Sequence, residues 1–194
     1  MKKVEITGLV LIFVLILYRI LGGMQLHVTL RVFMVLISIF YMWFGFFLFN
    51  EVKLKDLISK KRRRTFTTPQ IASSILAGFI YSLCFITLVH VLEFYRGMNF
   101  LTVFSLLLNL LLILAGLFYT RYKKEYTTFF QQFTKRSIFY VLLFGFVWIV
   151  PIEKKLNVLY KEHPRFIEAY IAHMEDPDDP EKLNHLREER SAFR

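Results

Sequence analysis

Several ingredients of common enzyme sites are missing from this 194-residue sequence. Its one cysteine, Cys84, excludes an intramolecular disulfide, a CxxC redox pair and a cysteine-based zinc site. The sequence also lacks GxSxG, HExxH, Walker and GxGxxG motifs. It shows no paired acids of a proton relay within an apolar stretch, and no obvious inverted repeat of the kind found in many transporters. These absences lower the case for catalysis without excluding it.

Charged residues are few, at 21%, whereas apolar residues make up 56% and aromatic residues 18%, with a mean hydropathy of +0.47. A soluble domain is usually about 45–50% apolar. The surplus excludes a disordered chain, a fibrous repeat and an ordinary soluble enzyme. The formal net charge of +10 would suggest nucleic acid, but the basic residues lie beside apolar runs. We therefore expect a membrane protein with no nucleic-acid partner.

Five apolar stretches predict an all-α, polytopic integral membrane bundle. A spanning segment needs about 20 mostly apolar residues and must be helical, because lipid offers no hydrogen-bond partner to the backbone. Four stretches have this length, and the fifth is shorter but is flanked by long charged side chains that can reach outward. The predicted spans are about 6–23, 28–49, 71–92, 98–119 and 138–152. They form a bundle over 1–152, followed by an extramembrane helical tail over 153–194.

The basic residues of the loops predict the orientation in the membrane. The loop 50–70 holds seven basic and two acidic residues, and the loop 120–136 holds five basic residues and one acid. The alternate connections, 25–27 and 93–97, have no net charge. Because basic loops stay in the cytoplasm, we expect a cytoplasmic N-terminus in a bacterial inner membrane and a periplasmic tail. If the fifth stretch does not cross, the tail returns to the cytoplasm.

Ionisable side chains gather at the predicted outer face, and such residues near membrane depth are functional candidates. Glu93 is the only acid among them and is the natural partner for Arg19 or Arg31. We favour a structural role, in which ion pairs among these residues hold the first three predicted spans together (the ion-pair knot). Two alternatives stay open: the arginines bind an anionic lipid or solute, or His27 and His90 hold a haem iron. The cluster comprises Arg19, His27, Arg31, His90, Glu93 and Arg96.

Small and polar side chains recur at four-residue spacing in the third and fourth predicted spans, so they share a helix face. Close packing and hydrogen bonds drive helix association in lipid. This pattern favours packing within the bundle, and the alternative is a seam that recruits another subunit. The residues are Ser74, Gly78, Ser82, Ser105 and Asn109. The aromatic-rich segment 40–47 is expected to face lipid.

A run of consecutive basic residues lies directly before the third predicted span. Each such charge near an anionic leaflet contributes about 1 kcal/mol of attraction. The run therefore predicts topology setting and lipid contact, with binding of an acidic partner as the alternative. It consists of Lys60, Lys61, Arg62, Arg63 and Arg64.

The composition changes in the tail, where eight basic and ten acidic residues occur. Pro164 opens an amphipathic helix, and Asp179 and Pro180 can start a second one. Neither helix can build a core alone, so the apolar stripe must lie on the bilayer, on the spans or on a partner. The mixed charges around it favour a protein partner. The stripe comprises Phe166, Ile167, Tyr170, Ile171 and Met174.

These patterns predict a non-catalytic accessory or scaffold subunit of a larger membrane complex. Its expected partners are membrane lipids and other integral membrane proteins, bound through the small-residue faces and the tail. No cofactor or metal site is expected, because the histidine spacing in the tail does not match a zinc ligand pair. The alternatives are a small transporter or enzyme for a lipid or anionic solute, and a bis-histidine haem subunit.

Overall fold

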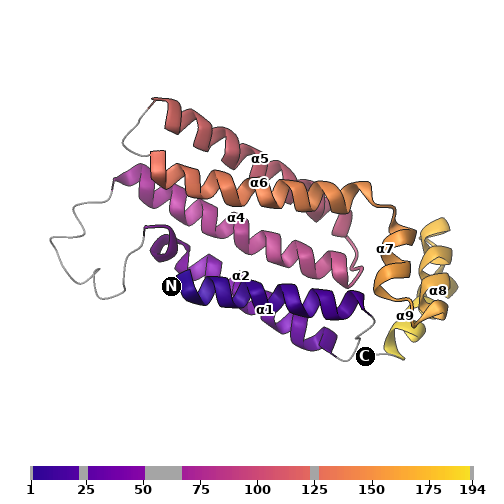
Figure 1. Ribbon diagram of the computed structural model, residues 1–194. Helices are drawn as coiled ribbons and strands as arrows, with labels where there is room; N and C mark the ends of the chain where they lie inside the picture. The colour runs from indigo at the N-terminus through magenta and orange to yellow at the C-terminus, as the bar shows by residue number, and fades with distance from the viewer. Residues whose placement is uncertain (1, 22–25, 51–66, 123–126, 193–194) are drawn as a thin grey trace. The chain divides into compact units, whose positions relative to one another are not determined.

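The computed structural model describes residues 2–21, 26–50, 67–122 and 127–192. The described residues form helices and turns without a strand, so the all-helical fold is confirmed. The helices, labelled as in Figure 1, are α1 (Lys2–Ile20), α2 (His27–Phe49), α4 (Thr68–Leu92), α5 (Met98–Tyr122), α6 (Thr127–Ile149), α7 (Ile152–Leu159), α8 (Pro164–Glu175) and α9 (Pro180–Ser191).

The chain divides into two compact units, and the first contains residues Met1–Val14 and Val28–Ile149. Its helices run alongside one another as a bundle (Figure 1). Three of them, α2, α4 and α5, are long and apolar enough to cross a membrane, and α6 joins them if it forms one bent span with α7. The fold is therefore compatible with a helical integral membrane protein, as the apolar stretches predict.

The first predicted span, 6–23, corresponds to α1, which is not among the helices long and apolar enough to cross a membrane in the described residues. Helix α1 ends at Ile20 in the described part of the chain, and Lys3, Glu5 and Arg19 interrupt its ends. The stretch between Glu5 and Arg19 covers only about 20 Å at about 1.5 Å per residue, short of the hydrocarbon thickness of about 30 Å. A five-span topology thus stays a prediction.

The fifth predicted span, 138–152, has different boundaries in the structure. Helix α6 begins earlier, at Thr127, and ends at Ile149, and a separate helix, α7, begins at Ile152. Pro151 lies at the break, where its lack of a backbone N–H is tolerated because it precedes the first turn of α7. The apolar pattern alone ran through this proline, so it misplaced the helix end.

Helices α2 and α4 approach so closely that only glycine fits at their contact. A Cβ atom on Gly78 would lie 2.6 Å from the carbonyl oxygen of Tyr41, and one on Gly45 would lie 2.7 Å from the Cα of Gly78. Beside this contact, the Ser38 hydroxyl is 2.8 Å from the hydroxyl of Ser82. Small residues let the backbones meet, and hydrogen bonds hold them there.

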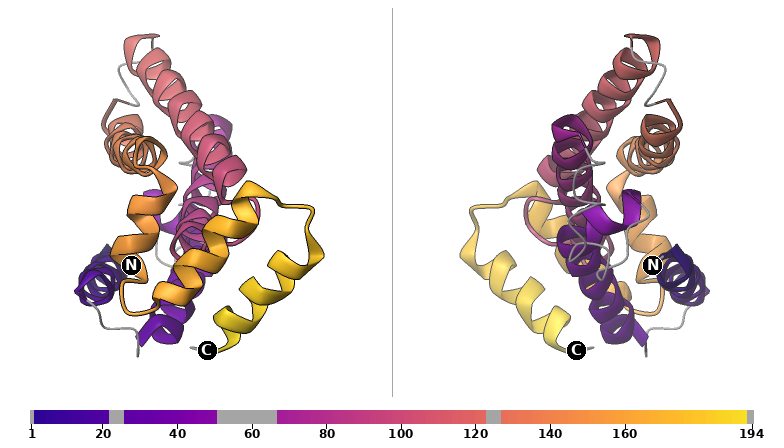
Figure 2. Two further views of the ribbon diagram at one scale, coloured as in Figure 1. Left: turned by 90° about the vertical axis from the view of Figure 1, so that its right-hand side faces the viewer. Right: turned by 90° about the vertical axis from the view of Figure 1, so that its left-hand side faces the viewer.

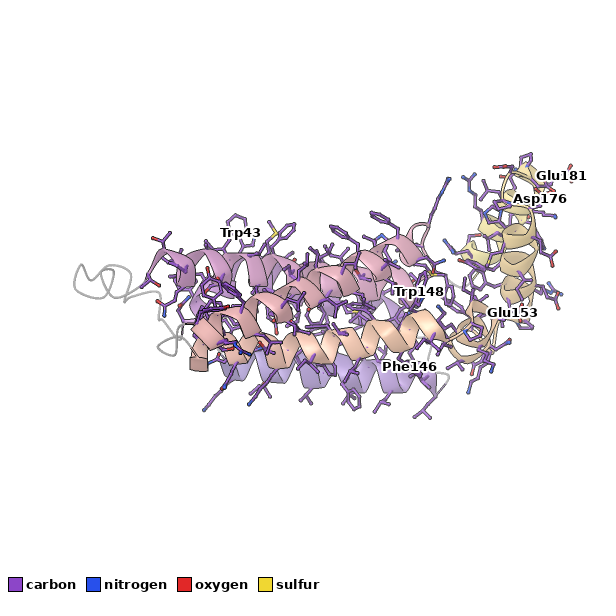
Figure 3. All side chains as sticks on the ribbon, turned by 90° about the horizontal axis from the view of Figure 1, so that it is seen from above. Trp43, Phe146, Trp148, Glu153, Asp176 and Glu181 are labelled. Carbon is purple, nitrogen blue, oxygen red and sulfur yellow. The ribbon has the colours of Figure 1, made fainter. Side chains whose placement is uncertain are left out.

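The core of the bundle is strongly aromatic. Tyr41, Phe49, Tyr81 and Phe133 are almost completely buried and touch one another through edge and stacked ring contacts. Trp43, two residues from Tyr41, instead points away from the bundle (Figure 3) and is 67% exposed. Segment 40–47 therefore exposes one helix face only, because successive residues lie on different faces, and contact of that face with lipid stays a prediction.

The second unit contains residues Leu15–His27 and Val150–Arg194. Helices α8 and α9 run back along one another as a hairpin (Figure 2). Their core contains Phe166, which is fully buried, with the Tyr160 ring centroid 4.7 Å away and the Arg190 guanidinium 5.6 Å above its ring. The Asp179 carboxylate accepts the backbone N–H of Glu181 at 2.8 Å, which caps α9 as the sequence predicts.

Candidate functional site

The most distinctive polar site in the first unit is a buried ion pair between α1 and α6. The guanidinium of Arg136 donates two hydrogen bonds to the Glu5 carboxylate, from Nε to Oε1 at 3.2 Å and from Nη2 to Oε2 at 3.1 Å. The Glu5 side chain is 4% exposed and that of Arg136 is 26% exposed. A paired fork of this kind is stronger and more directional than a single charged contact.

Two residues of α2 complete the surroundings of this ion pair. The Tyr41 hydroxyl donates to Oε1 of Glu5, so the carboxylate accepts three hydrogen bonds. The Arg136 guanidinium also lies 5.2 Å from the centre of the Phe49 ring, a distance at which cation and ring attract. One charged cluster therefore joins α1, α2 and α6 through buried polar contacts.

A second polar contact fixes α4 against α6 beside the ion pair. The Tyr81 hydroxyl donates to the backbone carbonyl of Phe133 at 3.0 Å and lies 3.1 Å from the Ser137 hydroxyl. The Tyr81 ring stacks on Tyr140, with the ring centroids 5.5 Å apart. Tyr140 is thereby held against the core, with its neighbour Phe139 61% exposed.

A cleft of about 240 Å³ opens next to the ion pair. Its lining combines apolar surface with two cationic side chains and two phenols. Lys135 at the cleft is exposed and forms no ion pair with any residue that the structure describes. The lining residues are Leu9, Tyr41, Lys135, Arg136, Phe139 and Tyr140.

The predicted outer-face cluster is divided between the two units. In the first unit, the guanidinium of Arg31 donates to the Tyr95 hydroxyl at 2.9 Å, a different partner from the Glu93 carboxylate that the sequence favoured. The His90 ring contacts Tyr95, and its Nδ1 lies 2.9 Å from the carbonyl oxygen of Ile86. Glu93 is buried, whereas Arg96 is exposed.

In the second unit, the buried Arg19 side chain donates to the Tyr160 hydroxyl at 2.8 Å. His27 is also buried and belongs to this unit. Three roles proposed for this cluster stay predictions. They are a structural network of ion pairs, a binding site for an anionic lipid or solute, and haem ligation by His27 and His90. Within the described ranges, no three His, Cys, Asp or Glu residues lie close enough to hold a metal ion.

The small-residue faces pack helices within the chain. The Asn50 amide donates to the Ser74 hydroxyl at 2.7 Å, beside the contact of Gly78 with α2. On the other side of α4, the Ser105 hydroxyl is 2.7 Å from that of Thr87. Asn109 donates to the Cys84 sulfur at 3.2 Å and to the Ser105 carbonyl at 2.8 Å. A seam that recruits another subunit stays a prediction.

The apolar stripe of the tail faces the tail's own helices. Phe166 and Ile167 are buried, Tyr170 and Ile171 are half-buried, and Met174 is 45% exposed. Burial raises the pKa of the Tyr170 phenol from its ordinary value, and nearby Arg190 opposes the rise. The binding of a partner through this stripe stays a prediction. The basic run 60–64 lies outside the described residues.

The sequence pattern includes Arg136 only as part of the basic loop 120–136 and does not single out Glu5, so it missed the ion pair. The available signal was the single acid next to the first apolar stretch, since an ionisable residue at membrane depth needs a partner. The partner itself lies 131 residues away, and no local pattern connects the two.

No protein-family model matches this chain, and no curated protein or solved structure matches it either. The site is therefore interpreted from its own geometry.

Proposed function

We propose that the protein is a non-catalytic accessory or scaffold subunit of a larger membrane complex, and that its tail is the surface that binds a partner protein. The hydrogen bond from Arg19 to Tyr160 carries this proposal. It connects the last turn of α1 to the residue that ends α7. Ordering a tail costs conformational entropy, and a fixed tail presents one defined surface to a partner.

Two further contacts support an ordered tail. The Arg19 guanidinium lies 5.3 Å from the centre of the Tyr160 ring, and the Lys161 ammonium donates to the Leu21 carbonyl at 3.3 Å. The Tyr160 ring in turn contacts Phe166 at the start of α8. The hydrogen bond of Arg19 is thus continuous with the core of the hairpin.

The outward surface of the hairpin carries charges of both signs. Glu168, Glu175, Arg187 and Glu188 are exposed. Mixed charges of this kind suit complementary pairing with a protein surface, which improves specificity and association rate. They do not suit an anionic bilayer, which attracts a basic helix. The proposed partner is therefore a protein.

The proposal places the protein in a bacterial inner membrane, with a cytoplasmic N-terminus and, if α6 and α7 form a crossing, a periplasmic tail. The alternation of basic and neutral loops supports this orientation. An Arg62→Cys variant in a Cys84→Ser background tests it. We expect the new thiol to stay unlabelled by an impermeant maleimide in intact cells and to be labelled after lysis.

The test of function is cross-linking in native membrane followed by purification and mass spectrometry of the full chain. We expect a stoichiometric partner protein with wild type, and at least about fivefold less of it with Tyr160→Phe, which removes one buried hydrogen bond. Tyr122→Phe is the matched control, because Tyr122 is 70% exposed. That variant should retain the partner at the wild-type level.

Charge reversal on the hairpin surface gives an independent readout. Glu188→Lys should release the partner while leaving the helix content of the chain unchanged, because Glu188 is exposed. Recovery of a monodisperse monomer from cross-linked native membrane would overturn the proposal.

A further inference from the structure

We propose that the cleft beside the ion pair of Glu5 and Arg136 binds the phosphate headgroup of a membrane phospholipid, with preference for an anionic lipid. This site is distinct from the tail surface and does not depend on the proposed partner. Its occupant is inferred from three properties of the cleft: an unsatisfied phenol, an uncompensated cation and an apolar margin.

The phenol is that of Tyr140, which is only 5% exposed and lines the cleft. Its hydroxyl forms no hydrogen bond with any residue that the structure describes. The hydroxyl itself is not fully enclosed by protein, so it can donate a hydrogen bond into the cleft. A ligand oxygen in the cleft would accept this hydrogen bond, and a phosphate offers such oxygens.

The cation is Lys135. Arg136 is already neutralised by Glu5, and Tyr41 donates its hydroxyl to the same carboxylate. Lys135 is the remaining charge in the lining, so the cleft carries one net positive charge. A single cation at the mouth favours a ligand with one net negative charge over a zwitterion.

The margin of the cleft is apolar and exposed, which identifies a lipid as the source of the phosphate. Phe139 lines the cleft, and Leu142 lies one turn further along α6 with 68% exposure. On the facing helix, Val10 and Phe13 are 56% and 61% exposed next to Leu9. Surfaces of this kind in a membrane helix contact acyl chains. A headgroup in the cleft would place its chains along them.

A neighbouring hollow shows that these properties are specific to the cleft. A space of about 310 Å³ between α5 and α6 also includes Lys135. Its other lining residues are Leu117, Thr120, Gln131 and Thr134, which supply no second cation and no phenol. Gln131→Leu alters this hollow alone, so it serves as a local control.

The test is native mass spectrometry of the purified full chain titrated with phosphatidylglycerol or with phosphatidylcholine of identical chains. We expect wild type to bind one phosphatidylglycerol about fivefold more tightly than phosphatidylcholine. Lys135→Ala should lower the affinity for phosphatidylglycerol about fivefold and leave that for phosphatidylcholine unchanged. Tyr140→Phe should lower both affinities about fivefold, because both lipids carry the phosphate that accepts the hydrogen bond.

Arg121→Ala is the control for general electrostatic attraction, because it removes an exposed cation outside the cleft. This variant and Gln131→Leu should change both affinities by less than about twofold. Equal losses with Lys135→Ala and Arg121→Ala would overturn the proposal, as would equal binding of the two lipids to wild type. Displacement of the lipid by inorganic phosphate would show that the site binds free phosphate instead.

Discussion

The two units stabilise buried polar groups in different ways. In the first unit, Glu5 and Arg136 form a two-bond ion pair that tyrosine and phenylalanine enclose. In the second, the buried Arg19 guanidinium donates to the Tyr160 phenol, and Glu168, Glu175, Arg187 and Glu188 of the helical hairpin are exposed. The bundle thus encloses opposite charges together, whereas the tail encloses mainly aromatic surface.

This difference follows from the surroundings that each unit must satisfy. A buried charge loses its hydration, so the bundle encloses both members of the pair and bonds them to each other. The helical hairpin instead leaves its charges on the surface and needs only a small apolar core. The consequence is that the bundle should respond most to broken polar contacts and the tail to lost apolar volume.

The largest expected effect is on the tail core. Phe166→Ala removes a fully buried ring, and truncations of this kind cost about 3–5 kcal/mol. A short hairpin has little stability to lose, so α8 and α9 should exchange their amide hydrogens as if unfolded while α4 and α5 stay protected. Hydrogen-exchange mass spectrometry measures this directly. The matched control Phe146→Ala, at a 68% exposed site, should leave the exchange pattern unchanged.

Breaking the ion pair is the next largest effect. Arg136→Leu leaves the Glu5 carboxylate buried without its charged partner, which should lower the free energy of unfolding by about 3 kcal/mol. The double variant Glu5→Leu/Arg136→Leu should regain most of this loss, because apolar replacement of both partners is often neutral. Denaturant titration in detergent micelles measures both. If the double variant is as unstable as the single one, burial of an unpaired charge is not the cause.

Helix approach within the bundle gives an intermediate effect. Gly78→Ala places a methyl group 2.6 Å from the Tyr41 carbonyl oxygen, and such overpacking costs about 1–3 kcal/mol. Gly145→Ala meets no atom within 4 Å and should stabilise α6 by about 0.5–1 kcal/mol through helix propensity. Thermal unfolding in one detergent compares the two variants. Equal midpoints would show that α2 and α4 separate at little cost.

The smallest effect is expected at the start of α9. Asp179→Ala removes the carboxylate that accepts the Glu181 N–H and should cost about 1 kcal/mol. The amides of the first turn of α9 should then exchange about fivefold faster. Asp178→Ala, which removes an exposed acid one residue earlier, should not change them. A similar rate increase in both variants would assign the effect to charge rather than to capping.

The sequence placed the long apolar helices well, because each contains its own signal. The third predicted span, 71–92, lies within α4, and the fourth, 98–119, lies within α5. The helix boundary differs where proline interrupts the pattern, because α6 ends at Ile149, before Pro151, and the predicted fifth span ran to residue 152. The caps at Asp179 and Pro180 were predictable because a capping side chain bonds to its own next turn.

Length, composition and periodicity thus determined an all-helical chain with apolar, membrane-length segments and a charged helical tail, because each of these properties is local in the sequence. Tertiary structure alone decided that Glu5 meets Arg136, that the small faces of α4 serve α2 and α5, and that Tyr140 borders a cleft. These contacts join residues far apart in the chain, and only the packing of helices brings their side chains within bonding distance.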